Sequence, residues 1–482
     1  MLRTLALMLV LAVAAGASGV RVVCTDPGDC TSDVQRAFDD VSADAVTLPA
    51  PTSSGAPWQV RPLFIRRSNV VVTLEPGAVL EAKAGSFIGT NDCLLTIRNA
   101  SNVTLTGSGG WLLKMRRPYL PPRYAPAEWR HVLSIVASRN VTVVGGTLSD
   151  AGGDGIEVSG GFGPTEANFS ASVTLRDLRI ARAWRNGLSV ISVKGLLVQD
   201  VTIRDTAGTN PMFGIDVEPD ATPFGYLRDL VFRRVRLLNN LNGGFSMGLY
   251  GLVGEPGAVA PTGGLSLLVD GMEISGSTGN RTACACANGT RRVCSHSGVG
   301  MQLSNYPLGV KNGSVATGSA TFRDTYIWNC SASGVDITNW DRGRIALAFD
   351  NLTIGSGVAT LPEYWPGHPL SGPPVPIALA PYDDDPAHLV GGVTFGPRAA
   401  TVDMRDFDLL STPAPAPAPA ARGGARPWLS VTYLGTPVGM ADVTGAATVL
   451  VSDSVGKSMC EIAAGTSAVN ISVSINCTIV GS

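Results

Sequence analysis

Charged side chains are scarce in this chain of 482 residues: they make up only 15% of the sequence, and the formal net charge is −2. So few cations leave no basic surface of the kind that binds nucleic acid or an anionic membrane, and we expect neither partner. After residue 19 no hydrophobic run is long enough to span a bilayer. The segment 479–482 also lacks the hydrophobic tail of a lipid-anchor signal. We therefore expect a protein with no membrane span.

Aromatic residues are also few, at 6%, whereas glycine and proline are abundant, with 57 and 32 copies. These numbers are too high for a helical protein, and the glycines follow no collagen period. Because apolar residues still make up 45% of the chain, a large core can form. The composition therefore predicts an all-β protein in which turns join many short strands.

The first 19 residues have the features of a signal peptide. Arg3 gives the positive start, 5–13 the apolar stretch and 15–19 the small residues near a cleavage site. An anchoring helix is the alternative, but the apolar run is too short to span a bilayer. We therefore predict export to the extracellular space or cell wall. Sequons for N-glycosylation agree with a secreted glycoprotein, and they begin at Asn99, Asn102, Asn140, Asn168, Asn280, Asn288, Asn312, Asn329, Asn351, Asn470 and Asn476.

Nine cysteines in an exported chain predict disulfides, and the odd count leaves at least one cysteine unpaired. Cys93 and Cys330 are expected to be buried inside coils. The cysteines near residue 290, together with His296, could instead bind zinc, although their spacing and the compartment favour a disulfide-pinned loop. The pairs that we expect are local: Cys24 with Cys30, Cys460 with Cys477, and Cys294 with Cys284 or Cys286.

One pattern recurs along the chain: apolar, any, apolar, two polar or small residues, then apolar, any, apolar. The alternation of period two on both sides of a short break predicts two strands that meet at a bend. Copies of this repeat lie at 173–180, 196–203, 230–237, 267–274, 320–327, 347–354 and 402–409.

A shorter motif of glycine, apolar, any, apolar follows most copies and predicts a third strand. Its glycines at 155, 187, 214 and 244 lie 32, 27 and 30 residues apart. Three short strands in a repeat of that length make one coil of a solenoid, which buries its apolar face only by stacking on its neighbours. We therefore predict a right-handed, single-stranded parallel β-helix. A β-sandwich would instead show alternating hairpins and no motif kept in phase.

The β-helix is assigned to residues 20–411, with an amphipathic helix that starts at Thr31-Ser32-Asp33 and covers the first coil. Long spacers at 275–299 and 355–392 are expected to form loops. An Ala/Pro-rich linker spans 412–427. Residues 428–482 follow as a small β-rich segment, either the final coils or a separate module.

The chain resembles the pectin-lyase-like superfamily of β-helix proteins in Asp33-Val-Gln-Arg-Ala-Phe38, Asn140-Val-Thr-Val and Val201-Thr-Ile. Over residues 30–355 it is similar to secreted proteins of the parallel-β-helix-repeat group. The similar stretches are Glu128-Trp-Arg-His131, Gly152-Gly-Asp-Gly-Ile156 and Gly214-Ile-Asp-Val-Glu-Pro219. The superfamily contains polysaccharide lyases, glycoside hydrolases, sugar epimerases and adhesins, so the resemblance implies a carbohydrate-directed function without choosing a reaction.

The stretch 153–157 is similar to the polygalacturonase motif Asn-Thr-Asp-Gly-apolar-Asp, which carries a catalytic aspartate. Here glycines replace the Asn and Thr, Glu157 replaces the last Asp, and Asn186 stands where that family has paired aspartates. The Gly-His-Gly and Arg-Ile-Lys motifs of the family are absent from the sequence. These departures argue against a polygalacturonase.

Keeping the coils in phase brings distant residues together, because adjacent coils lie about 4.8 Å apart. The middle residue of each short motif points outward, which predicts an outer column of Ser134, Glu157, Ser189, Asp216 and Ser246. The residues just before these strands stack in the same way. That stacking predicts a second column of His131, Asp154 and Asn186, flanked by Arg130 and Arg185 and by Trp129 and Trp184.

These columns contain the residue types of a sugar-cleaving site. Asp154, Glu157 and Asp216 are predicted to supply acid and base, with His131 orienting them. Glu157 and Asp216 could reach the roughly 6.5–9.5 Å separation of inverting glycosidases. The predicted substrate-binding residues are Arg130 and Arg185 for acidic groups, Trp129 and Trp184 as platforms, and Asn186 and Glu218.

We therefore predict a secreted enzyme that hydrolyses an extracellular polysaccharide, with acidic polymers among the candidate substrates. A lyase or epimerase is the first alternative, with Ca²⁺ held by Asp216 and Glu218 and with Lys114 as a further cation. A non-catalytic carbohydrate-binding surface or wall protein is the second. In that case His131 and Asp154 would form a structural hydrogen bond, and the tryptophans would cover a coil corner. No cofactor signature is present, and Ca²⁺ is the metal ion that this candidate site could hold.

Overall fold

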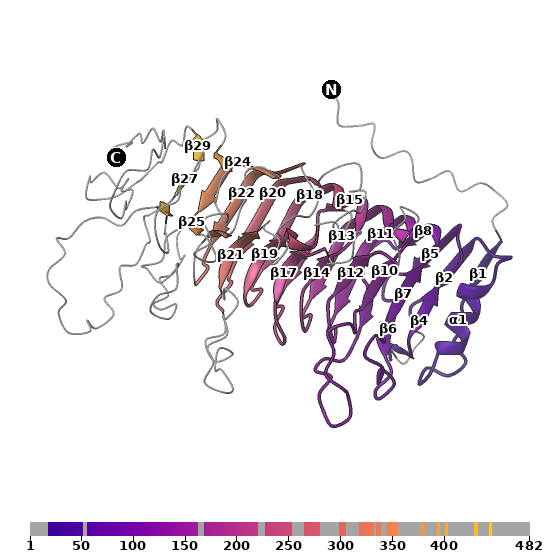
Figure 1. Cartoon of the computed structure of the whole chain (residues 1–482). Coiled ribbons are helices and arrows are strands. Elements are labelled where there is room, and N and C mark those ends of the chain that lie inside the picture. The colour runs from indigo at the N-terminus through magenta and orange to yellow at the C-terminus, as the bar shows by residue number, and fades with distance from the viewer. Residues whose placement is uncertain are drawn as a thin grey trace, which may run out of the picture.

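A computed structural model describes residues 18–51, 55–161, 168–219, 227–252, 265–279, 298–304, 318–331, 334–338 and 345–354, and the strands at 377–380, 393–395, 401–402, 429–431 and 443–445. Successive coils stack along one axis, with each strand paired in parallel to the equivalent strand of the next coil (Figure 1). The chain is a right-handed parallel β-helix, so the fold predicted from the repeat is confirmed.

The coils present two sheets. Within the described residues, sheet B contains 11 strands: β4 (Leu63–Ile65), β7 (Leu95–Arg98), β10 (Leu133–Val136), β12 (Ile156–Ser159), β14 (Leu188–Val190), β17 (Phe213–Val217), β19 (Gly243–Gly248), β21 (Val299–Ser304), β23 (Val335–Thr338), β25 (Ile377–Ala380) and β28 (Leu429–Val431). These strands include the predicted glycine motifs.

Sheet A holds the predicted two-strand repeats. Its 18 described strands are β1 (Gly19–Arg21), β2 (Ala45–Leu48), β3 (Trp58–Val60), β5 (Val70–Leu74), β6 (Val79–Ala82), β8 (Ser101–Thr106), β9 (Trp111–Lys114), β11 (Arg139–Ser149), β13 (Ser170–Ala181), β15 (Val193–Gln199), β16 (Thr202–Arg204), β18 (Leu227–Leu238), β20 (Leu265–Ser275), β22 (Gly318–Trp328), β24 (Ile345–Ile354), β26 (Val393–Phe395), β27 (Thr401–Val402) and β29 (Val443–Gly445).

A left-handed residue makes the bend in each repeat of sheet A. The fifth residue of the repeat has a positive φ in all six described copies: 53° at Asp177, 55° at Asp200, 50° at Arg234, 77° at Gly271, 49° at Asp324 and 61° at Asn351. Asp, Asn and Gly adopt this conformation more readily than other residues. The two-residue break in the sequence pattern is therefore the point at which the strand turns.

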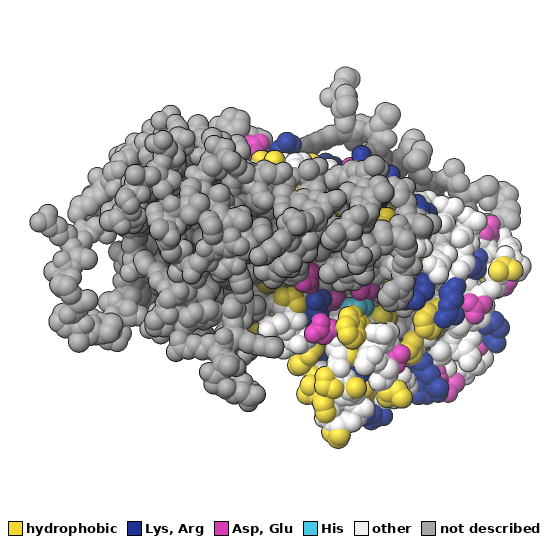
Figure 2. Space-filling model, viewed as in Figure 1, with side chains coloured by type: hydrophobic (Ala, Val, Ile, Leu, Met, Phe, Trp, Pro, Cys, Tyr) yellow, Lys and Arg dark blue, Asp and Glu magenta, His cyan; other side chains and the backbone are white. Residues whose placement is uncertain are grey.

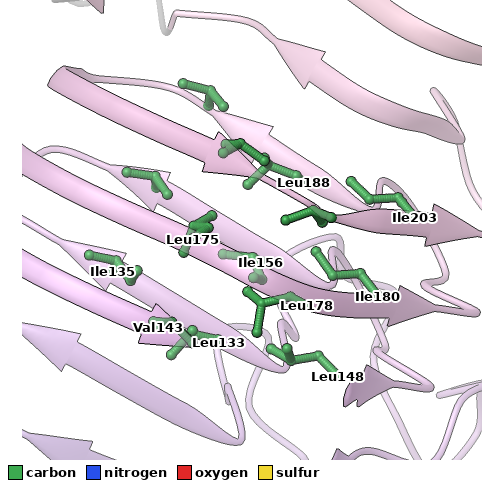
Figure 3. Close-up of a cluster of buried hydrophobic side chains, with 14 of the residues drawn as sticks. Leu133, Ile135, Val143, Leu148, Ile156, Leu175, Leu178, Ile180, Leu188 and Ile203 are labelled. Carbon is green, nitrogen blue, oxygen red and sulfur yellow. The ribbon is translucent and has the colours of Figure 1, made fainter. Parts of the chain in front are cut away.

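Inward-facing aliphatic side chains form continuous columns between the sheets (Figure 3). In sheet B, Leu133 pairs with Ile156, which pairs with Leu188. In sheet A, Leu148 and Ile180 stack in the same way. Full burial of one such side chain stabilises the fold by about 1.5–3 kcal/mol. Coils stacked in register are therefore more stable than coils out of register, which would leave these side chains exposed.

The glycines that open the sheet B strands allow the coils to approach closely. A Cβ at Gly155 would lie 2.6 Å from the carbonyl oxygen of Gly187, and a Cβ at Gly187 would lie 2.6 Å from that of Gly214. The same conflict follows at Gly214 and Gly300. The motif is therefore conserved from coil to coil within the chain because each glycine leaves room for the next one.

The helix α1 (Thr31–Asp39) packs against the first coils and buries Val34, Ala37 and Phe38, as predicted for a cap (Figure 1). Cys30 occupies the N-cap position without a side-chain capping bond, so the expected cap by a residue of 31–33 is not formed. Cys30 is instead joined to Cys24 by the predicted disulfide. Cys93 and Cys330 are free and buried, also as predicted.

Other predictions fall partly outside the described residues. These include 1–17 of the predicted signal peptide, most of the spacers 275–299 and 355–392, the linker 412–427, the disulfides beyond residue 280 and the zinc alternative. Gly19, the last residue of the predicted leader, begins β1, which pairs with β2. Strands β28 and β29 extend the two sheets by pairing with β25 and β26. No helix in the described ranges is long and apolar enough to cross a membrane.

The glycine contacts give a direct test of coil stacking. We expect Gly187→Ala to destabilise the protein by about 1–3 kcal/mol, because the new methyl group would also meet Ile203 at 2.0 Å. Chemical denaturation measures the change. Gly28→Ala is the matched control, since its Cβ would meet only the exposed side chain of Asp26, at 3.1 Å. Equal stability of the two variants would contradict the close approach of the coils.

Candidate active site

The outer column of sheet B forms as predicted. Backbone register places Ser134 beside Glu157, Glu157 beside Ser189, Ser189 beside Asp216, and Asp216 beside Ser246. Ser189 and Asp216 are nevertheless buried, and only 3% of Asp216 is exposed. The Glu157 side chain keeps 19% of its surface accessible. The column is therefore a recessed polar strip with one accessible carboxylate.

Hydrogen bonds join His131, Asp154 and Asn186 from coil to coil, as their predicted column requires. The backbone N–H of Asp154 donates to Nδ1 of His131 at 3.0 Å. The backbone N–H of Asn186 donates to Oδ1 of Asp154 at 2.8 Å, and Oδ1 of Asn186 accepts from the N–H of Phe213 at 3.0 Å. All three side chains are buried, so each one fixes the backbone of the following coil.

The hydrogen bond to Nδ1 determines the tautomer of His131. Because Nδ1 accepts a hydrogen bond from a backbone N–H, it carries no proton itself, and the proton of the neutral ring is on Nε2. Nε2 lies 3.7 Å from Oε1 of Glu157 and has no hydrogen-bond partner in the described part of the chain. The other oxygen of Glu157 accepts from the hydroxyls of Ser134 and Ser159 at 2.9 and 3.2 Å. The imidazole and two serines thus surround this carboxylate.

Arg185 lies among three carboxylates. Its guanidinium is 3.3 Å from Glu128, 3.3 Å from Asp154 and 3.5 Å from Glu218. Burial alone would lower the pKa of Arg185, but these carboxylates and Asp216 overcome that effect and raise it. The sequence analysis predicted that Arg185 would bind acidic groups of a ligand. Its fork is instead occupied by acidic groups of the protein.

Asp216 is a buried carboxyl group whose surroundings raise its proton affinity. Burial, and then the nearby charge of Glu218, raise its pKa to about 7, against the opposing effects of Arg185 and a hydrogen bond from Ser246. Nδ2 of Asn186 donates to Oδ2 of Asp216 at 3.1 Å. Asp216 can therefore hold a proton near neutral pH, as a general acid must.

The two predicted Trp–Arg pairs, Trp129 with Arg130 and Trp184 with Arg185, have different environments. Trp129 is 53% exposed beside the site, whereas Trp184 is half-buried under Gly208. Arg130 is fully buried, and its guanidinium donates to the carbonyls of residues 87, 88, 89 and 125. This position does not fit the predicted role of Arg130 in binding acidic groups, because the side chain joins two loops instead.

Glu128 is the residue that the sequence prediction missed. It directly precedes Trp129 and pairs with Arg185 across two coils. Gly152 and Gly153 make room for its loop, since a Cβ at Gly153 would lie 2.1 Å from the carbonyl oxygen of Glu128. The same in-phase alignment that selected Trp129 would have included Glu128 if it had been extended by one residue.

The described residues contain no group of three or more side chains arranged to hold a metal ion. Asp216 and Glu218, the expected Ca²⁺ ligands, lie beside Asn186 and Arg185. The face drawn in Figure 2 shows acidic, basic and histidine side chains together, next to hydrophobic side chains. This mixture is an ion-paired polar site rather than a carboxylate cage.

No protein-family model matches the chain. Two curated proteins of Bacillus subtilis (strain 168) are similar over part of it. The uncharacterized protein YclG is 27% identical over 161 residues, which is 31% of this chain and 26% of that protein. The SPbeta prophage-derived uncharacterized protein YorA is 27% identical over 159 residues, or 31% and 27%. The chain thus spans about a quarter of the length of these relatives.

Among solved structures, the endo-xylogalacturonan hydrolase of Aspergillus tubingensis matches with a TM-score of 0.50 and 12% identity, over 81% of this chain and 97% of that one. A family 28 exopolygalacturonase of Yersinia enterocolitica gives 0.47 and 11%, over 97% and 78%. The mannuronan C-5 epimerase AlgE6 A-module of Azotobacter vinelandii gives 0.40 and 12%, over 97% of both. The parallel β-helix fold is therefore shared with the endo-xylogalacturonan hydrolase, which confirms the predicted resemblance at the level of fold.

The buried carboxyl of Asp216 predicts a pH-dependent stability. In the folded protein the carboxyl of Asp216 keeps its proton up to about pH 7, whereas an aspartate in the unfolded chain releases it at about pH 4. The folded state therefore binds more protons between these values, and the free energy of unfolding falls as the pH rises through them. We expect Asp216→Asn to remove this decrease, which amounts to about 4 kcal/mol at most.

Urea denaturation at pH 4 and pH 8 measures the effect. Asp177→Asn, which removes an exposed aspartate of sheet A, controls for the loss of one carboxylate. If the free energy of unfolding fell by the same amount from pH 4 to pH 8 in Asp216→Asn and in the wild type, Asp216 would not titrate in a buried site.

Proposed function

We propose that the chain is a secreted enzyme that cleaves an extracellular polysaccharide by hydrolysis of a glycosidic bond on the outer face of sheet B. The observation that carries this proposal is the alignment, in one register column, of a buried carboxyl with a raised pKa, Asp216, and an accessible carboxylate, Glu157. Glycoside hydrolysis needs these two groups, one to protonate the leaving oxygen and one to act on the other face of the sugar.

The spacing of the two groups supports inversion of the anomeric centre. Glu157 and Asp216 are two strands apart, which corresponds to roughly 9–10 Å between their backbones. Side chains that lean toward each other by a small amount enter the roughly 6.5–9.5 Å range in which a water molecule fits beside the sugar. In this arrangement Asp216 is the general acid, and Glu157 is the general base that activates the water.

His131 and Asp154 act as positioning residues. The neutral ring of His131 directs its Nε2 proton toward Glu157, and the backbone N–H of Asp154 fixes that ring. Both oxygens of Asp154 are near other groups of the protein, namely the Asn186 N–H and the Arg185 guanidinium. Asp154 therefore supports the site instead of supplying the acid or base that the sequence analysis assigned to it.

Two further observations favour hydrolysis over elimination or epimerisation. Those reactions need a cation that neutralises the uronate carboxylate, and Arg185 already faces three carboxylates of the protein. The fold is also that of a protein named as an endo-xylogalacturonan hydrolase. The exposed Trp129 offers an apolar surface next to the site on which a pyranose ring can lie.

The proposed roles predict the behaviour of two variants. We expect Asp216→Asn and Glu157→Gln each to reduce kcat by about 10²–10⁴-fold, because each removes one proton-transfer group. In the wild type, kcat/KM should fall above about pH 7 as Asp216 loses its proton. Reducing ends measure hydrolysis, ultraviolet absorbance detects unsaturated products of elimination, and proton NMR identifies the first anomer released.

Asp270→Asn, on the outer face of sheet A, is the matched control and should retain activity. Full activity of both site variants on a cleaved polysaccharide would refute the assignment. Unsaturated products would show that the enzyme cleaves its substrate by elimination and not by hydrolysis.

The platform role of Trp129 is tested separately. We expect Trp129→Ala to weaken glycan affinity, seen as a rise in KM of about tenfold, while the melting temperature stays unchanged because the ring is 53% exposed. The matched control is Tyr326→Ala, which removes a 42% exposed aromatic residue from sheet A and should leave KM unchanged. Equal KM values for both variants and the wild type would exclude the platform.

A further inference from the structure

The candidate site carries an excess of negative charge. Its five carboxyl groups come from three coils, and four of them lie around one guanidinium, that of Arg185. The carboxyl groups are those of Glu128, Asp154, Glu157, Asp216 and Glu218. Even with a proton on Asp216, the described contacts bring one cation, Arg185, to the three carboxylates of Glu128, Asp154 and Glu218.

The neighbouring cations in the described part of the chain are bound to other groups. Arg130 donates to four main-chain carbonyls and is fully buried. Arg117 donates to the carbonyls of residues 183 and 207, and Arg182 pairs with Asp150. Lys114 pairs with Glu81. None of these contacts turns a positive group toward Glu157.

His131 does not add positive charge either. Its Nδ1 accepts the backbone N–H of Asp154, which requires the neutral ring. Its Nε2 lies 3.7 Å from the accessible carboxylate of Glu157, belongs to a side chain that is 98% buried, and has no hydrogen-bond partner among the described residues. Such a neutral donor can serve a hydroxyl or water at Glu157, but it cannot neutralise an acidic sugar.

An anionic sugar at this position would meet like charges in a partly buried site, where water screens them poorly. A neutral pyranose has no such penalty, and its apolar face matches the exposed ring of Trp129. From this charge balance we infer that the site takes glycans with no carboxylate or sulfate on the sugars at the cleavage point and excludes uronate and sulfated polymers. The inference rests on the proposed function, since it names the substrate class of the same site.

Binding and cleavage are measured on one polysaccharide panel so that the two proposals can fail separately. The panel contains neutral, carboxylated and sulfated polysaccharides at low ionic strength, with the wild type assayed for reducing ends and Asp216→Asn assayed for binding. A neutral polymer that binds is then oxidised at C6 to its uronate form, which changes the charge but keeps the linkage. We expect the oxidised form to bind at least tenfold more weakly.

Charge-removing variants complete the test. Glu128→Gln combined with Glu218→Gln should recover part of the affinity for the oxidised polymer, because two of the repelling carboxylates are gone. Glu273→Gln on sheet A, where Glu273 pairs with Arg236, is the matched control and should recover none.

The outcomes separate the two claims. Binding of a neutral polymer with loss on oxidation supports the charge selection even if no bond is cleaved, and absent cleavage then overturns hydrolysis alone. Tighter binding or faster cleavage of uronate or sulfated polymers overturns the charge selection and leaves hydrolysis standing. Failure to bind any glycan on the panel overturns both.

Discussion

The parallel register between successive coils is the constraint on which the site depends. Backbone pairing across sheet B sets Glu157, Ser189 and Asp216 at successive levels of one column, although they lie up to 59 residues apart in the chain. The opening glycines enforce the spacing, since a methyl group at Gly187 would collide with the next coil. In such a solenoid, residues at the same position of successive repeats become neighbours in space. The position of a side chain within its repeat therefore determines which side chains it can contact.

The polar strip is stable because its groups satisfy one another. Asn186 illustrates this: it donates to Asp216 and Ser189, accepts from the N–H of Phe213, and is fully buried. Burial of an unpaired polar group is costly, so a connected network is the form in which such residues can lie inside a solenoid wall. The same burial raises the pKa of Asp216. Asp154 and Asn186 hold coils together in the same network that contains Asp216 and Glu157, the two groups for which we propose acid–base roles.

The sequence predicted the features that recur with each coil and missed the contacts that irregular loops make. The strand repeats, the bend residues, the outer column, the capping helix and the Cys24–Cys30 disulfide all follow from local patterns, and the structure contains them. The environment of Arg130 does not follow from any repeat. It depends on loops near residues 87 and 125, whose carbonyls surround the guanidinium. Glu128 was missed for a different reason: the in-phase alignment of the coils was stopped at Trp129, one residue short of it.

A double-mutant cycle on Asn186 and Asp216 tests the central claim of coil registry most directly. These residues lie 30 positions apart in the sequence, and only stacked coils bring Nδ2 of one within 3.1 Å of Oδ2 of the other. Free energies of unfolding are measured for Asn186→Ala, Asp216→Ala and the double variant. Registry predicts a coupling energy of about 0.5–3 kcal/mol. Additive effects, to within about 0.3–0.5 kcal/mol, would mean that the two side chains do not interact and would contradict the account.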